Sequence, residues 1–142
     1  MIKNHFPEEI LKVKFIEYYT SNYFEKYYSE VPVFSRSVDI VKFDEENNTL
    51  TAIELKINDW KRAINQVLNV SMCFDYLAIC IPRPKTLIGQ KKIIDYCSEI
   101  GIGIYFFNNE DQVFEHLCLE KKTKDIWDKQ KNQIFKYITE VK

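Results

Sequence analysis

Two carboxylates and one lysine stand inside neighbouring apolar segments near the middle of the chain. Asp39 lies in SVDIVKF (37–43), and Glu54 and Lys56 lie two residues apart in TLTAIELKI (49–57). Charged groups are costly among apolar strand residues unless they have partners. Carboxylates can hold Mg²⁺ or Mn²⁺, and a nearby ammonium can help to activate a metal-bound water or stabilise phosphate charge. These residue types therefore predict metal-assisted hydrolysis of a phosphodiester.

A polar turn between the two segments predicts which residues face one another. The cluster EENN (45–48) is typical of a hairpin turn. A turn centred in this cluster gives three facing pairs: Phe43 with Leu50, Val41 with Ala52, and Asp39 with Glu54. A slip of one or two residues would give other pairs, and this register is the simplest. Side chains alternate between strand faces, so Asp39, Glu54 and Lys56 are expected on one face, where a cation would relieve the repulsion between the carboxylates.

The residues around this hairpin resemble the motif of the PD-(D/E)xK nuclease superfamily, which includes restriction endonucleases and Holliday junction resolvases. The matching positions are Asp39, Glu54-Leu55-Lys56 on the next strand, and Gln66 on the helix that follows. The resemblance covers about residues 7–82. It implies that Asp39, Glu54 and the backbone carbonyl of Leu55 bind Mg²⁺, for which Mn²⁺ can substitute. It also implies that Lys56 is the catalytic lysine and that Gln66 positions the substrate or Lys56.

Further positions bear on the same resemblance. Val38 precedes Asp39, where the family often has proline. Some members carry an additional glutamate on the first helix or on the strand before the aspartate, and the candidates here are Glu9, Glu17 and Glu30. Helical spacing puts Gln66 and Arg62 beside an apolar stripe, from which they could reach a phosphate. Solvated helix side chains are the alternative for both, and Lys61 is expected to be exposed.

The spacing of apolar residues predicts the elements that would hold these side chains. Helices are expected from Pro7 to about Tyr28, with a break near 20–22; from Trp60, capped by Asn58-Asp59; and over about 87–100, ended by Gly101. The first helix is expected to gather Ile10, Val13 and Glu17 on one face. Strands are expected at 30–34, 37–43, 49–57, 75–81 and 101–107. The charged tail, about 112–142, is expected to form one or two helices.

This order of elements predicts an α/β fold with a restriction endonuclease-like core. Three strands joined by short turns make an antiparallel meander, and the later strand–helix–strand units imply parallel strands. The result is a mixed β-sheet flanked by helices on both faces. One domain is expected over residues 1–142, with a core at about 7–107 and a C-terminal helical extension at about 112–142.

The composition narrows the classes of function. Hydrophobic residues make up 46% of the 142 residues and charged residues 29%, which is typical of a globular chain and excludes disorder. The net charge of −1 gives no general attraction to nucleic acid, so DNA contacts would need a local basic patch. The four cysteines do not have zinc-ligand or CxxC spacing, and no apolar run reaches the ~20 residues of a membrane helix. We therefore expect free thiols, a cytoplasmic location and no membrane partner.

Several alternatives stay open at this point. An ExK tripeptide on a strand can be an ordinary cross-strand ion pair. The fold could also serve a catalytically silent nucleic-acid-binding or protein-interaction module, or a subunit of a larger nuclease complex. His116 and Cys118 could form a Cys–His nucleophile, although a structural cysteine is the simpler reading. The substrate could be DNA, which we favour, or RNA, and a two-fold homodimer would suit cleavage of both strands.

Overall fold

The computed structural model describes residues 7–21 and 24–141 and contains one six-stranded sheet with four helices. The strands are β1 (Glu25–Val33), β2 (Arg36–Asp44), β3 (Thr49–Leu55), β4 (Tyr76–Pro82), β5 (Gly103–Asn108) and β6 (Val113–Leu117). The helices are α1 (Glu8–Tyr19), α2 (Trp60–Leu68), α3 (Leu87–Ile100) and α4 (Asp128–Val141), and a short 3-10 helix, η1, spans Ser71–Cys73. Within the described ranges, no helix has the length and apolar content needed to span a membrane.

The sheet is mixed, with its strands in the order β1-β2-β3-β4-β5-β6. β1, β2 and β3 form the expected antiparallel meander, whereas β3–β4 and β4–β5 are parallel pairs. The predicted hairpin register is confirmed where the strands pair, because Phe43 faces Leu50 and Val41 faces Ala52. The parallel pairs need crossover connections, which α2 and α3 supply. The α/β class and the mixed sheet therefore agree with the sequence prediction.

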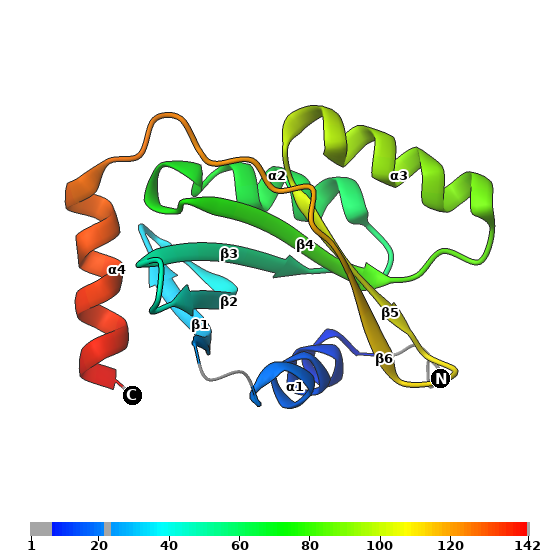
Figure 1. The fold of residues 1–142 in the computed structure, drawn as a ribbon, viewed down its shortest axis with the longest axis horizontal. Helices are drawn as coiled ribbons and strands as arrows, with labels where there is room; N and C mark the ends of the chain where they lie inside the picture. The colour runs from blue at the N-terminus through cyan, green and yellow to red at the C-terminus, as the bar shows by residue number, and fades with distance from the viewer. Residues whose placement is uncertain (1–6, 22–23, 142) are drawn as a thin grey trace.

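Helices cover both faces of the sheet, as Figure 1 shows. α1 covers one face, where it contacts β1, β3 and β6 and buries Leu11 and Phe15 against an aromatic-rich cluster. α2, α3 and α4 pack on the other face, where their buried residues join a second apolar cluster. Because both faces of the sheet are buried, the sequences of β4 and β5 are nearly continuous apolar runs.

The first helix is shorter than the sequence predicts. α1 ends at Tyr19, and residues 25–28, which were expected to be helical, form the start of β1. The predicted apolar face is also wrong, because Ile10 and Val13 are 44% and 48% exposed. Aromatic residues are common in strands. The residues from Glu25 onward form a strand here because they pair with β2 along its length.

The tail also differs from the prediction, because it contains a strand and one helix. β6 pairs antiparallel with β5, and α4 begins only at Asp128. Between them the backbone is irregular but held: the N–H of Thr123 donates to the carbonyl of Asp75 at 2.8 Å. The buried Asp75 side chain accepts from the Leu50 N–H at 2.8 Å and pairs with Lys131 on α4, also at 2.8 Å. This buried carboxylate fastens the tail to the sheet.

Helix ends elsewhere follow the predicted capping chemistry. Asp59 caps α2 by accepting the N–H of Arg62 at 3.1 Å. α3 ends at Gly101, whose φ of 79° is the left-handed conformation that glycine adopts at low cost. All four cysteines are free, and three of them are buried, with Cys118 exposed.

Candidate active site

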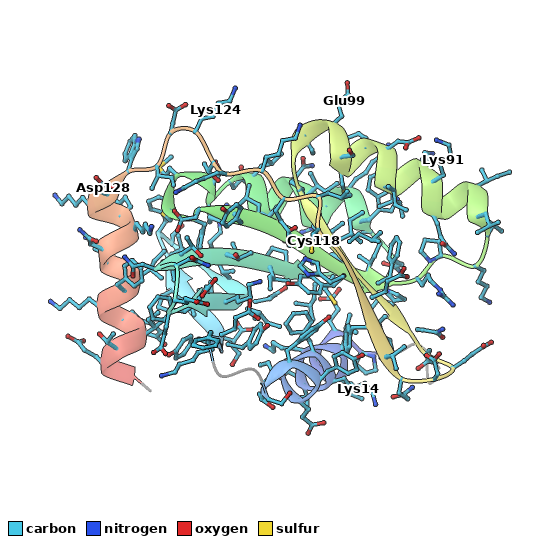
Figure 2. The ribbon with its side chains drawn as sticks, in the orientation of Figure 1. Lys14, Lys91, Glu99, Cys118, Lys124 and Asp128 are labelled. Carbon is cyan, nitrogen blue, oxygen red and sulfur yellow. The ribbon has the colours of Figure 1, made fainter. Side chains whose placement is uncertain are left out.

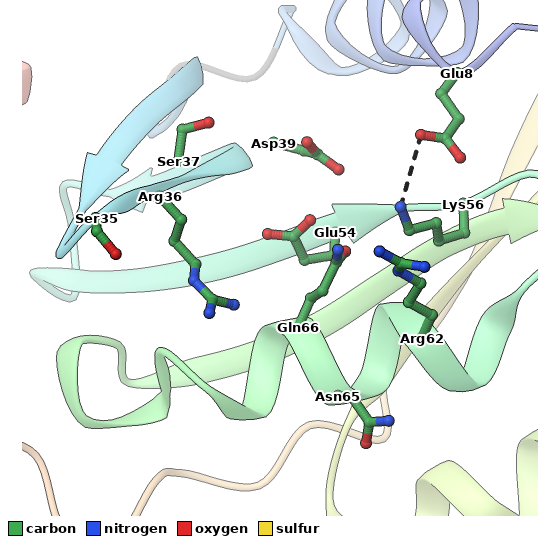
Figure 3. Close-up of a pocket in the computed structure, with 10 residues that line it drawn as sticks. All are labelled: Glu8, Ser35, Arg36, Ser37, Asp39, Glu54, Lys56, Arg62, Asn65 and Gln66. Atoms are coloured by element: carbon green, nitrogen blue, oxygen red, sulfur yellow. Dashed lines mark ion pairs between the residues drawn. The ribbon is translucent and has the colours of Figure 1, made fainter.

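Four of the five predicted site residues line one cavity of about 550 Å³ at the C-terminal end of β3, and the fifth, Leu55, borders a smaller cavity next to it. Asp39, Glu54, Lys56 and Gln66 all border it, and Figure 3 shows their polar ends directed toward a common space. The cavity lies between β2, the end of β3 and α2, with α1 at its far side. Three elements separated along the sequence therefore bring together the residues that the motif singles out.

Glu54 is a buried carboxylate in an apolar setting. Its side chain is on the face of β3 that carries Ala52, beneath α2, and the residue is only 5% exposed. Burial, with the adjacent Asp39 carboxyl adding to it, raises the pKa of Glu54 to about 9. Without a cation, Glu54 therefore holds its proton at neutral pH. A group in this condition is a strong candidate for a metal ligand, because a divalent cation would stabilise its charged form.

Asp39 connects β2 to β3 through its side chain. The backbone pairs of the two strands run up to Ile40 with Ile53, and beyond them Asp39 Oδ2 accepts the N–H of Leu55 at 2.9 Å. In an antiparallel pair, the N–H and C=O of one residue point to the same side of the strand. The carbonyl of Leu55 is therefore directed toward the Asp39 side, as the expected metal ligand must be.

β1 and β2 are distorted at two facing positions, Glu30 and Asp39. The backbone pairing passes from Ser29–Ile40 to Val31–Val38 and leaves these two residues out. Glu30 has a φ of 53°, which is uncommon for a residue with a side chain. Residues three apart in a regular strand lie on opposite faces. In β1, however, Tyr28 and Val31 lie in the same apolar cluster, and in β2 so do Val38 and Val41, so the alternation of faces is interrupted in both strands. Glu30 and Asp39 both border a small cavity at this point.

Lys56 follows the last residue of β3 and keeps the strand direction. Its N–H donates to the carbonyl of Cys80 on β4 at 3.1 Å. Its ammonium Nζ lies 4.0 Å from Oε1 of Glu8, the first residue of α1, as Figure 3 shows. The sequence prediction missed Glu8 as a site residue. Its place at an acidic helix start was visible in the sequence, but its distance from Lys56 depends on how α1 packs on the sheet.

α2 contributes polar side chains to the opposite wall of the cavity. Arg62 and Gln66 line it, and Figure 3 shows both directed toward the carboxylates, whereas Asn65 points away from them. Lys61 is exposed, with its ammonium 5.5 Å from the centre of the Trp60 ring. Arg36, at the start of β2, also borders the cavity and was missed by the sequence prediction.

The three additional glutamates have different positions. Glu9 and Glu30 border a second, smaller cavity of about 150 Å³, which shares Glu8 and Asp39 with the first. Glu30 accepts hydrogen bonds from Lys12 on α1 and, at 2.9 Å, from Ser37. The Lys12 ammonium lowers the pKa of Glu30, so Glu30 is a charged carboxylate already paired with a cation. Glu17 is exposed and lines neither cavity.

Comparisons with known proteins bear on the fold. No protein-family model matches the sequence, and no curated protein matches it. A solved structure of similar fold is the SPO1766 protein of unknown function from Silicibacter pomeroyi, with a TM-score of 0.65. The alignment covers 97% of this chain and 87% of that chain, at 11% sequence identity. At this identity the similarity concerns the fold alone, which is α/β with a mixed sheet.

Proposed function

We propose that the protein is a metal-dependent nuclease of the PD-(D/E)xK type that hydrolyses phosphodiester bonds, with DNA as the favoured substrate. The observation that carries the proposal is the meeting of Asp39, Glu54 and Lys56 at one cavity. Two of these groups are acidic oxygen donors, and the third is a flexible cation. The restriction endonuclease-like assignment of the core is part of this proposal.

The donor set suits a hard divalent cation. Asp39 and Glu54 offer carboxylate oxygens, and the carbonyl of Leu55 is directed to the same side. Mg²⁺ is usually held by one or two carboxylates together with waters, and Mn²⁺ accepts the same ligands. A bound cation would supply Lewis acidity toward the phosphodiester and would offset the repulsion between the two carboxylates. Burial of Glu54 is otherwise unfavourable, which supports a ligand role over an idle one.

The remaining residues act through charge and hydrogen bonding. Lys56 would orient the attacking water and stabilise the charge that develops on the phosphate. Gln66 would hold substrate or Lys56 in place from α2. Arg62 and Arg36 border the same cavity and would contact the nucleic-acid backbone as the local basic patch that a chain of net charge −1 needs.

A panel of nucleic acids tests this function. Duplex, single-stranded, flapped and four-way DNA, and RNA, would be incubated with the protein in Mg²⁺, in Mn²⁺ and in chelator. We expect cleavage of at least one substrate in either metal and none in chelator. Metal binding without cleavage of any substrate would point to a missing partner subunit. Neither binding nor cleavage would favour the silent interaction module.

A further inference from the structure

A second group of potential ligands lies where the chain leaves β6. His116, Cys118 and Glu120 each offer one donor atom, and these three atoms all lie within 4.8 Å of one another. His116 Nε2 is 2.8 Å from Glu120 Oε2, and Cys118 Sγ is 3.4 Å from Nδ1 of the same ring. Figure 2 labels Cys118, which comes directly after β6, an edge strand of the sheet.

The backbone turns tightly here and so directs the three side chains to one place. The N–H of Leu119 donates to the carbonyl of Leu117 at 2.8 Å, which closes a three-residue turn around Cys118. The N–H of Lys121 then donates to the carbonyl of Gly101 at 3.0 Å, so the chain stays beside the start of β5. These two backbone hydrogen bonds therefore hold the chain on either side of Glu120 and around Cys118.

Neighbours on β5 fit the cluster closely. The ring of Tyr105 stacks on that of His116 with centroids 4.0 Å apart and planes 8° apart, which fixes the plane of the imidazole. Gly103 lies under Glu120: a Cβ at that position would approach the carboxylate to between 2.1 and 2.5 Å. The absence of a side chain at Gly103 therefore leaves the space that the Glu120 carboxylate occupies.

We propose that His116, Cys118 and Glu120 form a binding site for Zn²⁺ or a similar borderline-soft transition metal. Imidazole, thiolate and carboxylate are the ligands that zinc uses in proteins, and a thiolate disfavours Mg²⁺. With a neutral imidazole, the two anionic ligands balance the charge of Zn²⁺. Ligand atoms of a tetrahedral site lie roughly 3–4 Å apart when the metal–ligand distances are about 2.0–2.3 Å. Nε2 of His116 lies 3.8 Å from the Cys118 sulfur, within this range, and 2.8 Å from the Glu120 carboxylate, slightly below it. Cys118 is exposed, so solvent can supply the fourth ligand.

This site is separate from the candidate nuclease site and does not depend on it. His116 pairs with Tyr105 and shares its face of the sheet, which α1 covers. Glu54 lies on the opposite face, under α2, with Ala52. The carboxylate site at Asp39 and Glu54 and the site with the Cys118 thiolate also prefer different metals. Each site can therefore be tested in the presence of the other.

Cobalt provides a direct probe, because Co²⁺ replaces Zn²⁺ and its spectrum reports a bound thiolate. The reduced full-length protein would be stripped with chelator and titrated with Co²⁺. We expect thiolate-to-cobalt charge-transfer absorption and d–d bands of four-coordinate intensity that saturate at one equivalent and disappear when Zn²⁺ is added. Cys118→Ser should abolish the charge-transfer band. His116→Ala should weaken Zn²⁺ binding by more than the roughly 10–100-fold that loss of a supporting residue causes.

A matched variant separates this proposal from the nuclease proposal. Asp39→Asn combined with Glu54→Gln removes the acidic donors of the other site and should leave the cobalt spectrum unchanged. Circular dichroism of every variant would check that the fold is retained. Absence of a stoichiometric charge-transfer band in the wild-type protein, or its persistence in Cys118→Ser, would overturn the zinc site and leave a His–Glu ion pair beside an idle thiol.

Discussion

The carboxylate of Asp39 accepts a hydrogen bond at 2.9 Å from the backbone N–H of Leu55, and this bond joins β2 to β3 where their regular pairing stops. The bond occupies one carboxylate oxygen of Asp39. It also fixes the direction of the strand on which Glu54 and Lys56 stand to either side of Leu55. The position of the proposed metal ligands thus depends on the Asp39 side chain, which takes the place of a backbone hydrogen-bond acceptor between the two strands.

Glu54 gives a pH-dependent stability in the absence of metal. Its pKa is raised from an ordinary 4.5 to about 9, so the folded state keeps a proton that the unfolded state releases. The free energy of unfolding should therefore fall as the pH rises between about 5 and 9. Glu54→Gln, which stays neutral, should lack this fall and should exceed the wild type at pH 8.5 by on the order of 1 kcal/mol or more. Urea unfolding in chelator at pH 6 and pH 8.5 measures the difference.

Two outcomes would contradict that assignment. Parallel stability–pH curves for the wild type and Glu54→Gln would mean that Glu54 is charged at neutral pH. An equal change in Glu17→Gln, an exposed glutamate outside both cavities, would mean that the effect is general to surface carboxylates.

Mn²⁺ should stabilise the wild-type protein through Asp39 and Glu54. A ligand at 100 times its dissociation constant stabilises the folded state by about 2.7 kcal/mol, which a thermal melt detects. Asp39→Asn should lose this stabilisation, whereas Glu9→Gln, on the rim of the smaller cavity, should retain it. If Mn²⁺ raised the melting temperature of Asp39→Asn as much as that of the wild type, the metal would have to bind elsewhere.

Much of the site could be predicted because it depends on local rules. The turn at 45–48 sets the hairpin register as far as Ile40 and Ile53, and Asp39 and Glu54, each next to one of these residues, border the same cavity. The cap at Asp59 and the period of α2 place Arg62 and Gln66 on the wall of the cavity. Each step uses a spacing of only a few residues.

The parts that could not be predicted depend on contacts between distant segments. Residues 25–28 belong to β1 rather than to a helix because β2 offers a partner strand, which no local pattern reveals. β6 likewise forms against β5, although the charged tail at about 112–142 was expected to be helical. Glu8 reaches Lys56 only because α1 packs on the sheet face, where it contacts β3.

Asp75 should be a major determinant of stability. It is 1% exposed, accepts the Leu50 N–H and pairs with Lys131. Asp75→Ala would leave that N–H and a partly buried ammonium without their partner, and we expect a loss of about 3 kcal/mol. The exposed pair Lys91–Asp95 provides the control, because Asp95→Ala should cost about 0.5 kcal/mol or less. Denaturant unfolding would compare the two, and similar losses would contradict the fastening role of Asp75.

Arg62 and Lys61 are adjacent cations with different expected effects on nucleic-acid binding. Arg62 lines the cavity, whereas Lys61 lies outside it, against Trp60. In a Lys56→Ala background, Arg62→Ala should weaken binding and reduce the slope of log K against log salt by about 1. Lys61→Ala should change neither quantity. Fluorescence anisotropy over a salt series measures both, and equal effects of the two variants would argue against contact through the cavity.

The central claim is most directly tested by the cleavage rate of the preferred nucleic acid in Mg²⁺, for wild type and Lys56→Ala under identical conditions. The proposed role of Lys56 predicts metal-dependent cleavage that falls by roughly 10²-fold or more in Lys56→Ala, while Mn²⁺ still stabilises the variant. Cleavage that continues at the wild-type rate in Lys56→Ala, or in chelator, would contradict the assignment of this cavity as a metal-dependent nuclease site.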